Sequence, residues 1–292
     1  MIVKRVRLAR LITCLCSVLA AVPMMIALSS APAGAATKIG NRSYHRLMGF
    51  DSCFHPSAAG LEDWLKHTPW YVYGTYLGGS GGAYVGCTPV SKSTLDSAIG
   101  RGWAVVPFWY GRQMPEACGQ AFFPDTISLN TSTAYSQGVQ QANDAKRAAE
   151  AEGYGGLDAI WYDLESYGVS GGGCIQAAEA FMRGWDHQMD DNTPYLGAMY
   201  GSTCGSFLSD FASLNPRPAY AAAADPNNNA GIYNLVCLPN KDWNDYNRIH
   251  QFTQPITLTY NGYTMPVDED CVNSTVDTNS PAGASDKCRY IS

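Results

Sequence analysis

Charge is scarce in this sequence, and basic charge is the scarcer kind. Only 15% of the 292 residues are charged, and 19 Lys and Arg stand against 25 Asp and Glu, for a formal net charge of −6. A protein that binds duplex nucleic acid needs a basic face, so this balance argues against nucleic acid as a partner. Hydrophobic residues form 46% of the chain and aromatic residues 12%, which excludes a disordered protein.

Signatures of metal and cofactor binding are missing as well. The five histidines show no HExxH or other close ligand spacing, and no two cysteines form a CxxC pair. The glycine-rich stretch at 78–82 lacks the Lys-Ser/Thr of a phosphate-binding loop. We therefore expect no metal and no cofactor. The chain also has no internal repeat, low-complexity segment or linker, which predicts one domain.

The amino end has the three parts of a secretory signal peptide. Residues 1–10 contain four basic and no acidic residues, an apolar run follows from Leu11 to Leu28, and a small-x-small site lies at Ala33 and Ala35. We expect cleavage there, leaving residues 36–292 as a single domain that is secreted and not inserted in the membrane. An uncleaved membrane anchor is the alternative. Loss of residues 1–35 changes the formal charge from −6 to −10.

Eight cysteines follow the signal segment, and an oxidising compartment favours disulfides among them. They are Cys53, Cys87, Cys118, Cys174, Cys204, Cys237, Cys271 and Cys288. The spacing does not determine how they pair. Cys271 with Cys288 is our local choice, because that bond holds down a tail without helices.

Strand-like and helix-like segments alternate through most of the remaining chain, which predicts parallel βαβ units. Expected strands are 46–50, 70–77, 103–109, 158–165, 194–200, 218–224, 248–252 and a last one that ends at Asp268. Expected helices are 58–67, one from about Ser91, 133–152, 175–189 and 204–211. Asn261-Gly262 indicates a hairpin between 257–260 and 263–267. The pattern predicts an α/β fold, a TIM-like (β/α) barrel of eight strands whose last third has lost its helices.

Several expected strands end in an acid. They end in Asp51, in the pair Asp163 and Glu165, in Asp225 and in Asp268. The carboxyl ends of barrel strands form the active face, so acids gathered there indicate chemistry. Asp163 and Glu165 are two residues apart and point to the same side of a strand, with Leu164 facing the helices. Such neighbours can divide the roles of acid and carboxylate in glycosidic bond cleavage. The alternative is structural: acids of this kind also cap helices or pair with Arg.

Aromatic residues cluster at the same strand ends. They are Tyr73, Tyr76, Trp109, Tyr110, Trp161, Tyr167, Tyr200 and Phe252. Sugar rings stack on aromatic side chains and leave hydroxyl groups for polar neighbours such as Gln251. We expect about half of these aromatics, Trp161 among them, to be barrel packing. Tyr76, Trp109 and Tyr200 are our candidates for sugar contact, and His250 is expected to touch the ligand beside Gln251.

A competing motif is G-x-S-x-G at 78–82, which matches the nucleophile elbow of serine hydrolases. An elbow runs directly from a strand into a helix. Here about ten loop residues are expected after the strand, so we interpret the stretch as a mobile loop rather than a nucleophile site.

Three segments resemble a known family: Met48–Cys53, Tyr76–Gly79 and Ile160–Glu165, which read MGFDSC, YLGG and IWYDLE. They resemble the glycoside-hydrolase-like barrel domain of secreted actinobacterial proteins, which is similar to the family 25 lysozymes. The resemblance covers about residues 45–273. It implies that Glu165 is the proton donor, that Asp163 is its partner, and that Asp51 and Asp268 line the sugar site.

The expected function is that of a secreted glycoside hydrolase. Its substrate would be a cell-wall polysaccharide, peptidoglycan or a related glycan, bound with the help of Asp51, Asp225 and Asp268. The alternative is a non-catalytic carbohydrate-binding or wall-associated module on the same barrel. We expect a monomer, either extracellular or associated with the cell wall.

Overall fold

The computed structural model describes residues 41–155, 159–168, 172–204, 208–244, 247–278 and 288, and the expected signal peptide 1–35 lies outside them. The strands are β1 (Asn41–Asp51), β2 (Trp70–Gly78), β3 (Ala104–Trp109), β4 (Ala159–Asp163), β5 (Leu196–Ser202), β6 (Tyr220–Ala224), β7 (Arg248–Gln251), β8 (Ile256–Tyr260) and β9 (Tyr263–Thr278). The helices are α1 (Ala58–His67), α2 (Ser80–Val85), α3 (Lys92–Arg101), the 3₁₀ turn η1 (Glu116–Cys118), α4 (Thr131–Glu152), α5 (Cys174–Asn192) and α6 (Leu208–Phe211).

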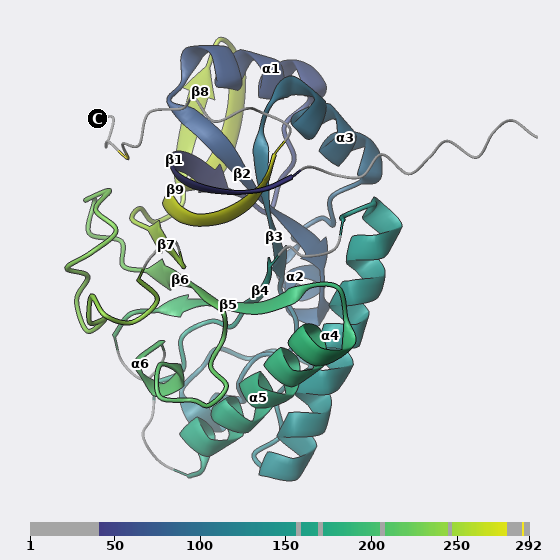
Figure 1. Cartoon of the computed structure of the whole chain (residues 1–292), viewed down its shortest axis with the longest axis vertical. Helices are drawn as coiled ribbons and strands as arrows, with labels where there is room; N and C mark the ends of the chain where they lie inside the picture. The colour runs from purple at the N-terminus through teal and green to yellow at the C-terminus, as the bar shows by residue number, and fades with distance from the viewer. Residues whose placement is uncertain are drawn as a thin grey trace, which may run out of the picture. The chain divides into compact units, whose positions relative to one another are not determined.

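Eight of these strands close into a barrel, which confirms the predicted fold class (Figure 1). Strands β1 to β7 are parallel neighbours in chain order. The predicted eighth strand needs a correction, because β9 does not end at Asp268 but continues to Thr278 and pairs antiparallel with both β7 and β1. No crossover helix follows β7, so the chain turns back through a hairpin and meets β7 in the opposite direction.

That hairpin forms as its sequence predicts. β8 and β9 pair from Ile256–Val267 to Tyr260–Tyr263, and Asn261 and Gly262 have φ of 47° and 85°, as a two-residue turn of the I′ kind requires. In the barrel, β9 places Asp268 opposite Asp51 on β1. Although β9 runs antiparallel to β1 and β7, Asp268 therefore lies at the same end of the barrel as the carboxyl ends of the parallel strands.

Side chains alternate between the barrel interior and the layer under the helices. Phe108, Trp161 and Tyr220 fill the interior, and the Trp161 ring centroid lies 6.2 Å from that of Phe108 and 6.0 Å from that of Tyr220, so Trp161 is barrel packing as expected. Leu164 lies in the outer layer, on the helix side, as its position between Asp163 and Glu165 predicts.

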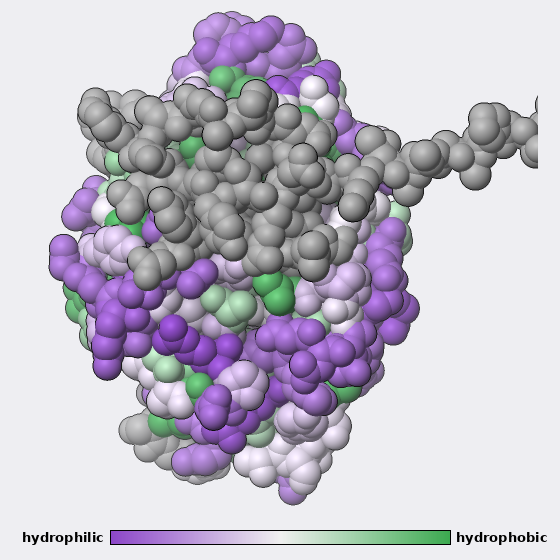
Figure 2. Space-filling model, in the orientation of Figure 1, coloured by the Kyte–Doolittle hydropathy of each residue, from purple (hydrophilic) through white to green (hydrophobic). Residues whose placement is uncertain are grey.

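Figure 1 shows α4 and α5 side by side on one flank of the barrel. Their contact is close because it is built on glycines: a Cβ on Gly138 would lie 2.0 Å from the Phe181 carbonyl oxygen, and one on Gly184 would lie 2.1 Å from that of Tyr135. The opposite faces of these helices are hydrophilic, shown in purple in Figure 2. The N-caps Ser57, Ser91 and Asn130 begin α1, α3 and α4, so Asp51 is not the cap of the first helix.

Among the described residues of the last third, the helix is the short α6, as predicted, and Arg248 holds the irregular segment that takes the place of longer helices. Its buried guanidinium donates to the carbonyl oxygens of Ile232, Pro239 and Asp242 in the irregular segment after β6. His250, two residues on, also points outward and is hydrogen-bonded to the carbonyl oxygens of Gly231 and Asp225. The expectation that His250 touches ligand is therefore wrong. Arg248 and His250 both anchor the irregular segment after β6, which covers β6 and β7 in place of helices.

The G-x-S-x-G stretch also differs from expectation. No ten-residue loop follows β2, because α2 begins at Ser80, directly after Gly78 and Gly79 with φ of 136° and 116°. A Cβ on Gly79 would lie 2.1 Å from the Tyr110 carbonyl oxygen, so this sharp turn requires glycine. An activated serine needs a base within hydrogen-bond reach, and the buried Ser80 Oγ has no hydrogen-bond partner.

Candidate active site

Disulfides join the loops at the carboxyl ends of the strands in consecutive pairs. Cys53–Cys87 connects the loops after β1 and β2, Cys118–Cys174 those after β3 and β4, and Cys204–Cys237 those after β5 and β6. The fourth bond, Cys271–Cys288, is the predicted local pair. Three covalent links on one end of the barrel restrict how far its rim can open.

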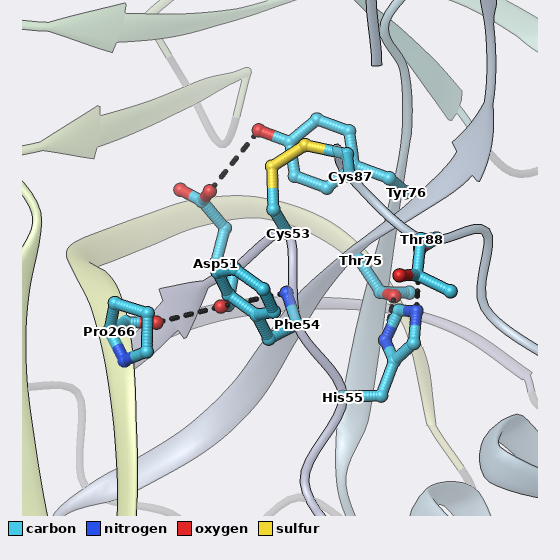
Figure 3. The surroundings of a disulfide bond; sticks show 10 residues. Asp51, Cys53, Phe54, His55, Thr75, Tyr76, Cys87, Thr88 and Pro266 are labelled. Atoms are coloured by element: carbon cyan, nitrogen blue, oxygen red, sulfur yellow. Dashed lines mark hydrogen bonds between the residues drawn. A yellow bond between two sulfur atoms is a disulfide. The ribbon is translucent and has the colours of Figure 1, made fainter. Parts of the chain in front are cut away.

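The first link is reinforced by hydrogen bonds (Figure 3). The Thr88 amide donates to the Cys53 carbonyl oxygen at 3.2 Å, and the Thr88 carbonyl oxygen lies 2.6 Å from His55 Nε2. On the other side of the disulfide, the Asp51 carboxyl group meets the hydroxyl of Tyr76 (Figure 3). These contacts therefore fix the loop that follows β1, next to Asp51 at the end of that strand.

A cleft of about 540 Å³ opens at this end of the barrel. Its wall is formed by Cys53, Tyr76, Val85, Tyr110, Glu165, Ser166, Tyr200, Ser202, Ala224, Pro226, Gln251, Thr253, Gln254, Pro255 and Asp268. The sequence candidates Glu165, Asp268 and Gln251 are therefore brought together with Tyr76 and Tyr200. Two more, Asp51 and Asp163, lie directly behind this wall, buried to 3% and 2% exposure.

Asp51 is held by a short chain of hydrogen bonds. Tyr76 Oη donates to its Oδ1 at 3.3 Å and Gln251 Nε2 to its Oδ2 at 3.1 Å, while Tyr200 Oη donates to Gln251 Oε1 at 2.8 Å. Burial raises the pKa of Asp51 to about 6 despite these donors. A carboxyl group that changes charge at about pH 6 therefore lies directly behind the cleft wall.

Asp163 and Glu165 are positioned by Gln113, a fully buried amide in the loop after β3. Its Nε2 donates to the Asp163 carbonyl oxygen at 2.8 Å, and its Oε1 accepts from the Glu165 amide at 2.8 Å. Gln120 Nε2 donates to Gln113 Oε1 at 2.9 Å. The two acids are thus fixed at their backbone, which holds the Glu165 side chain on the cleft wall and the Asp163 side chain behind it.

The pKa values of both acids are raised. Burial is the main cause for Asp163, whose pKa lies well above its usual range, and the charges of Glu165 and Asp51 add to it. Burial also raises the pKa of Glu165, while a hydrogen bond from Tyr110 opposes that rise. A protonated carboxyl group on a cleft wall is what a general acid requires.

Two acids of β9 complete the group, and only one of them was predicted. Burial, with the charges of Asp51 and Glu165, raises the pKa of Asp268 to about 8. Asp270 is buried, and its pKa lies well above the usual range, mainly through burial. The charge of the neighbouring Asp51 carboxyl group adds to that rise. The spacing of Asp268 and Asp270 repeats that of Asp163 and Glu165, which is the signal that could have identified Asp270.

Two predicted site residues are not part of the cleft wall. Trp109 belongs to the layer under the helices, where its Nε1 donates to Gln141 Oε1 of α4 at 2.9 Å. Its neighbour Tyr110 lines the cleft instead. Asp225 accepts hydrogen bonds from Asn227 Nδ2 and the Val236 amide, so its carboxyl group organises the segment after β6. We remove both from the set of ligand contacts.

Gln113 and Gln120 were missed because glutamine in a loop carries no pattern of its own.

Within the described ranges, no three His, Cys, Asp or Glu side chains are arranged to hold a metal ion. In the same ranges, no helix combines the length and hydrophobicity needed to cross a membrane.

A closed barrel with acids gathered at the carboxyl ends of its strands is the architecture of many carbohydrate-active enzymes. Residues 63–272 match the family described as the Rv2525c-like, glycoside hydrolase-like domain, and the chain belongs to that family. A comparison with curated proteins finds no match.

Solved structures share the fold at low sequence identity. An uncharacterized protein of B. stearothermophilus superposes with a TM-score of 0.53 at 15% identity, over 77% of this chain and 95% of that one. The Clostridium perfringens spore cortex lytic enzyme SleM has a TM-score of 0.50 at 14% identity, over 78% and 67%. The Mycobacterium tuberculosis Tat-secreted protein Rv2525c, in complex with L-tartrate, has a TM-score of 0.49 at 15% identity, over 77% and 95%.

Proposed function

We propose that this protein is a secreted glycoside hydrolase that cleaves a cell-wall polysaccharide, peptidoglycan or a related glycan. Membership of a glycoside hydrolase-like family supports the reaction class. The shared fold of SleM, a spore cortex lytic enzyme, supports a wall glycan as substrate. Four disulfides and the signal-like residues 1–35 support export to the cell wall or the medium.

The observation that carries the proposal is Glu165, an acid on the wall of the cleft with a raised pKa. In the proposed reaction it donates its proton to the glycosidic oxygen as the bond to the leaving sugar breaks. A water molecule adds to the anomeric carbon that is left and gives up a proton to a carboxylate of the acidic group. Asp163 lies behind Glu165, and its own raised pKa, caused by burial and by the charge of Glu165, leaves Glu165 as the acid that reaches the substrate. Asp51, which titrates near pH 6, supplies negative charge close to the developing cation.

The neighbouring cleft residues suit a sugar. Tyr76, Tyr110 and Tyr200 line the cleft with aromatic side chains, and Gln251 adds an amide to the same wall. The cleft contains no basic side chain on its wall, so it favours an uncharged ligand over a polyanion.

The test is hydrolysis of purified cell-wall polysaccharide by the parent and by Glu165→Gln. Gln keeps the shape of the side chain but cannot donate the proton, so we expect loss of reducing-sugar release by about 10²-fold or more. Asp225→Asn is the matched control, because that carboxyl group is bonded to Asn227 and Val236 and is not part of the cleft wall, so its loss should leave hydrolysis unchanged. Equal release by the parent and Glu165→Gln would refute the assignment of Glu165.

One observation favours a second candidate, a non-catalytic carbohydrate-binding module. Of the five clustered acids only Glu165 and Asp268 reach the cleft wall, and the pKa of Asp268, about 8, keeps it protonated at neutral pH. Wall fragments titrated into the parent distinguish the two functions. Tight binding without turnover over a long incubation would favour the module.

A further inference from the structure

Exposed aromatic side chains stand beside the cleft, outside the group described above. Tyr84 on α2 is 52% exposed and Phe122, in the loop after η1, is 55% exposed. Their ring centroids are 6.2 Å apart and nearly perpendicular. Val85, which is 49% exposed, follows Tyr84 and lines the cleft itself. Large apolar side chains left in water next to a cleft mark an interaction surface.

Ring contacts connect this surface to the acids. Tyr110, which is hydrogen-bonded to Glu165, has its ring centroid 6.1 Å from that of Phe123, and Phe123 lies 5.4 Å from Tyr84. Phe123 is buried and supports Tyr84 from below. The exposed rings therefore lie two ring contacts from the acid-bearing cleft, a separation that a short oligosaccharide spans.

The support under Tyr84 is rigid. The amides of Gly81 and Gly82 in α2 donate to the carbonyl oxygens of Gly111 and Tyr110 at 3.1 and 2.9 Å, and the Cys53–Cys87 disulfide follows directly. A Cβ on Gly81 would lie 2.5 Å from the Gly111 carbonyl oxygen, so α2 is pressed against the end of β3. A preorganised ring loses little entropy when a ligand stacks on it.

We propose that Tyr84 and Phe122, with Val85 between them and the cleft, form a stacking platform for sugar rings of an uncharged polysaccharide that continues beyond the cleft. This inference rests on the proposed function, because the ligand is the same glycan chain. It adds that the protein acts on long chains rather than on disaccharides. A peptide or protein with apolar side chains is the other possible occupant, and the experiment separates it from a glycan.

The experiment measures binding in a Glu165→Gln background, so that no probe is consumed. The probes are the hexamer and the dimer of β-1,4-linked N-acetylglucosamine, both uncharged. Substitution of both rings, Tyr84→Ala with Phe122→Ala, should weaken hexamer binding by roughly tenfold or more and leave dimer binding unchanged, because only the hexamer reaches the platform. Tyr84→Phe with Phe122→Tyr keeps both rings and should keep the affinity for the hexamer.

Tyr71→Ala is the matched control. This tyrosine is 40% exposed but lies at the amino end of β2, at the opposite end of the barrel from the cleft. Thermal unfolding of each variant checks that the fold is kept. Because both rings are exposed, we expect their replacement to leave the melting temperature nearly unchanged.

The outcomes separate this inference from the proposed function. In the Glu165→Gln background, hexamer binding that is equal with and without the Ala pair overturns the platform alone, as does an equal loss for hexamer and dimer. Loss of binding to an apolar peptide, with hexamer binding intact, also overturns it in favour of a protein partner. If neither the probes nor insoluble wall glycan bind to the parent, the proposed function fails and the platform fails with it.

Discussion

Replacing Asp51 with Asn should stabilise the protein at neutral pH, although it removes a residue of the candidate site. The Asp51 carboxyl group is buried, and its pKa rises from the usual 3.8 to about 6. In the folded protein the group therefore holds its proton up to a higher pH than in the unfolded chain. The free energy of unfolding falls as the pH rises from about 4 to about 6, and the full cost is present above that window.

The size of the effect follows from that pKa difference. At about 1.4 kcal/mol for each pKa unit, ionising Asp51 costs about 3 kcal/mol of stability above pH 6. The Asn variant avoids this cost. It can keep one of the two hydrogen bonds from Tyr76 and Gln251, and the lost one costs about 1 kcal/mol. We expect a net gain of about 1–2 kcal/mol at pH 7.5 and no gain at pH 3.5, where the carboxyl group is protonated in both states.

Denaturant unfolding followed by tryptophan fluorescence, with the disulfides intact, measures this difference at both pH values. Asp96→Asn is the control, because Asp96 is an exposed carboxyl group on α3 and its loss should change stability by less than about 0.5 kcal/mol. A variant that is less stable than the parent at pH 7.5, or a gain that does not depend on pH, would refute the reasoning.

Three further predictions concern the surroundings of the acids. Tyr110→Phe removes a hydrogen bond that lowers the pKa of Glu165, so the alkaline limb of the pH–rate profile should move to higher pH; a move to lower pH would contradict this role. Gln113→Met removes the two hydrogen bonds to the backbone of Asp163 and Glu165, so we expect the free energy of unfolding in denaturant to fall by about 2–4 kcal/mol and hydrolytic activity to fall with it. A variant with the stability and the activity of the parent would contradict this role. Trp109→Phe breaks the bond to Gln141 and should lower stability by about 1–2 kcal/mol while glycan titration stays unchanged; weaker glycan binding would return Trp109 to the site.

Local pattern was enough to locate most elements of the barrel. The predicted helix at 58–67 is α1, and the predicted strand at 70–77 differs from β2 by one residue. Period-two alternation placed Leu164 on the helix side, with Asp163 and Glu165 facing inward. These features are short-range, so neighbouring residues are sufficient to determine them.

The inner and outer faces of β3 could not be assigned in the same way. All six residues from Ala104 to Trp109 are buried, so the strand shows no hydrophobic alternation. Which of Trp109 and Tyr110 faces the cleft depends on where the barrel axis passes. The same holds for His250 and Gln251 on β7, whose four residues are also all buried.

The sequence alone determined the secondary-structure order, the local hairpin, the inward pair Asp163 and Glu165, and the family resemblance, because each depends on residues close together in the chain. Only the tertiary structure decided the antiparallel course of β9, three of the four disulfide pairs and the placement of Asp270 beside Asp51. These depend on contacts between residues far apart in the chain, and closure of the barrel is what brings them together.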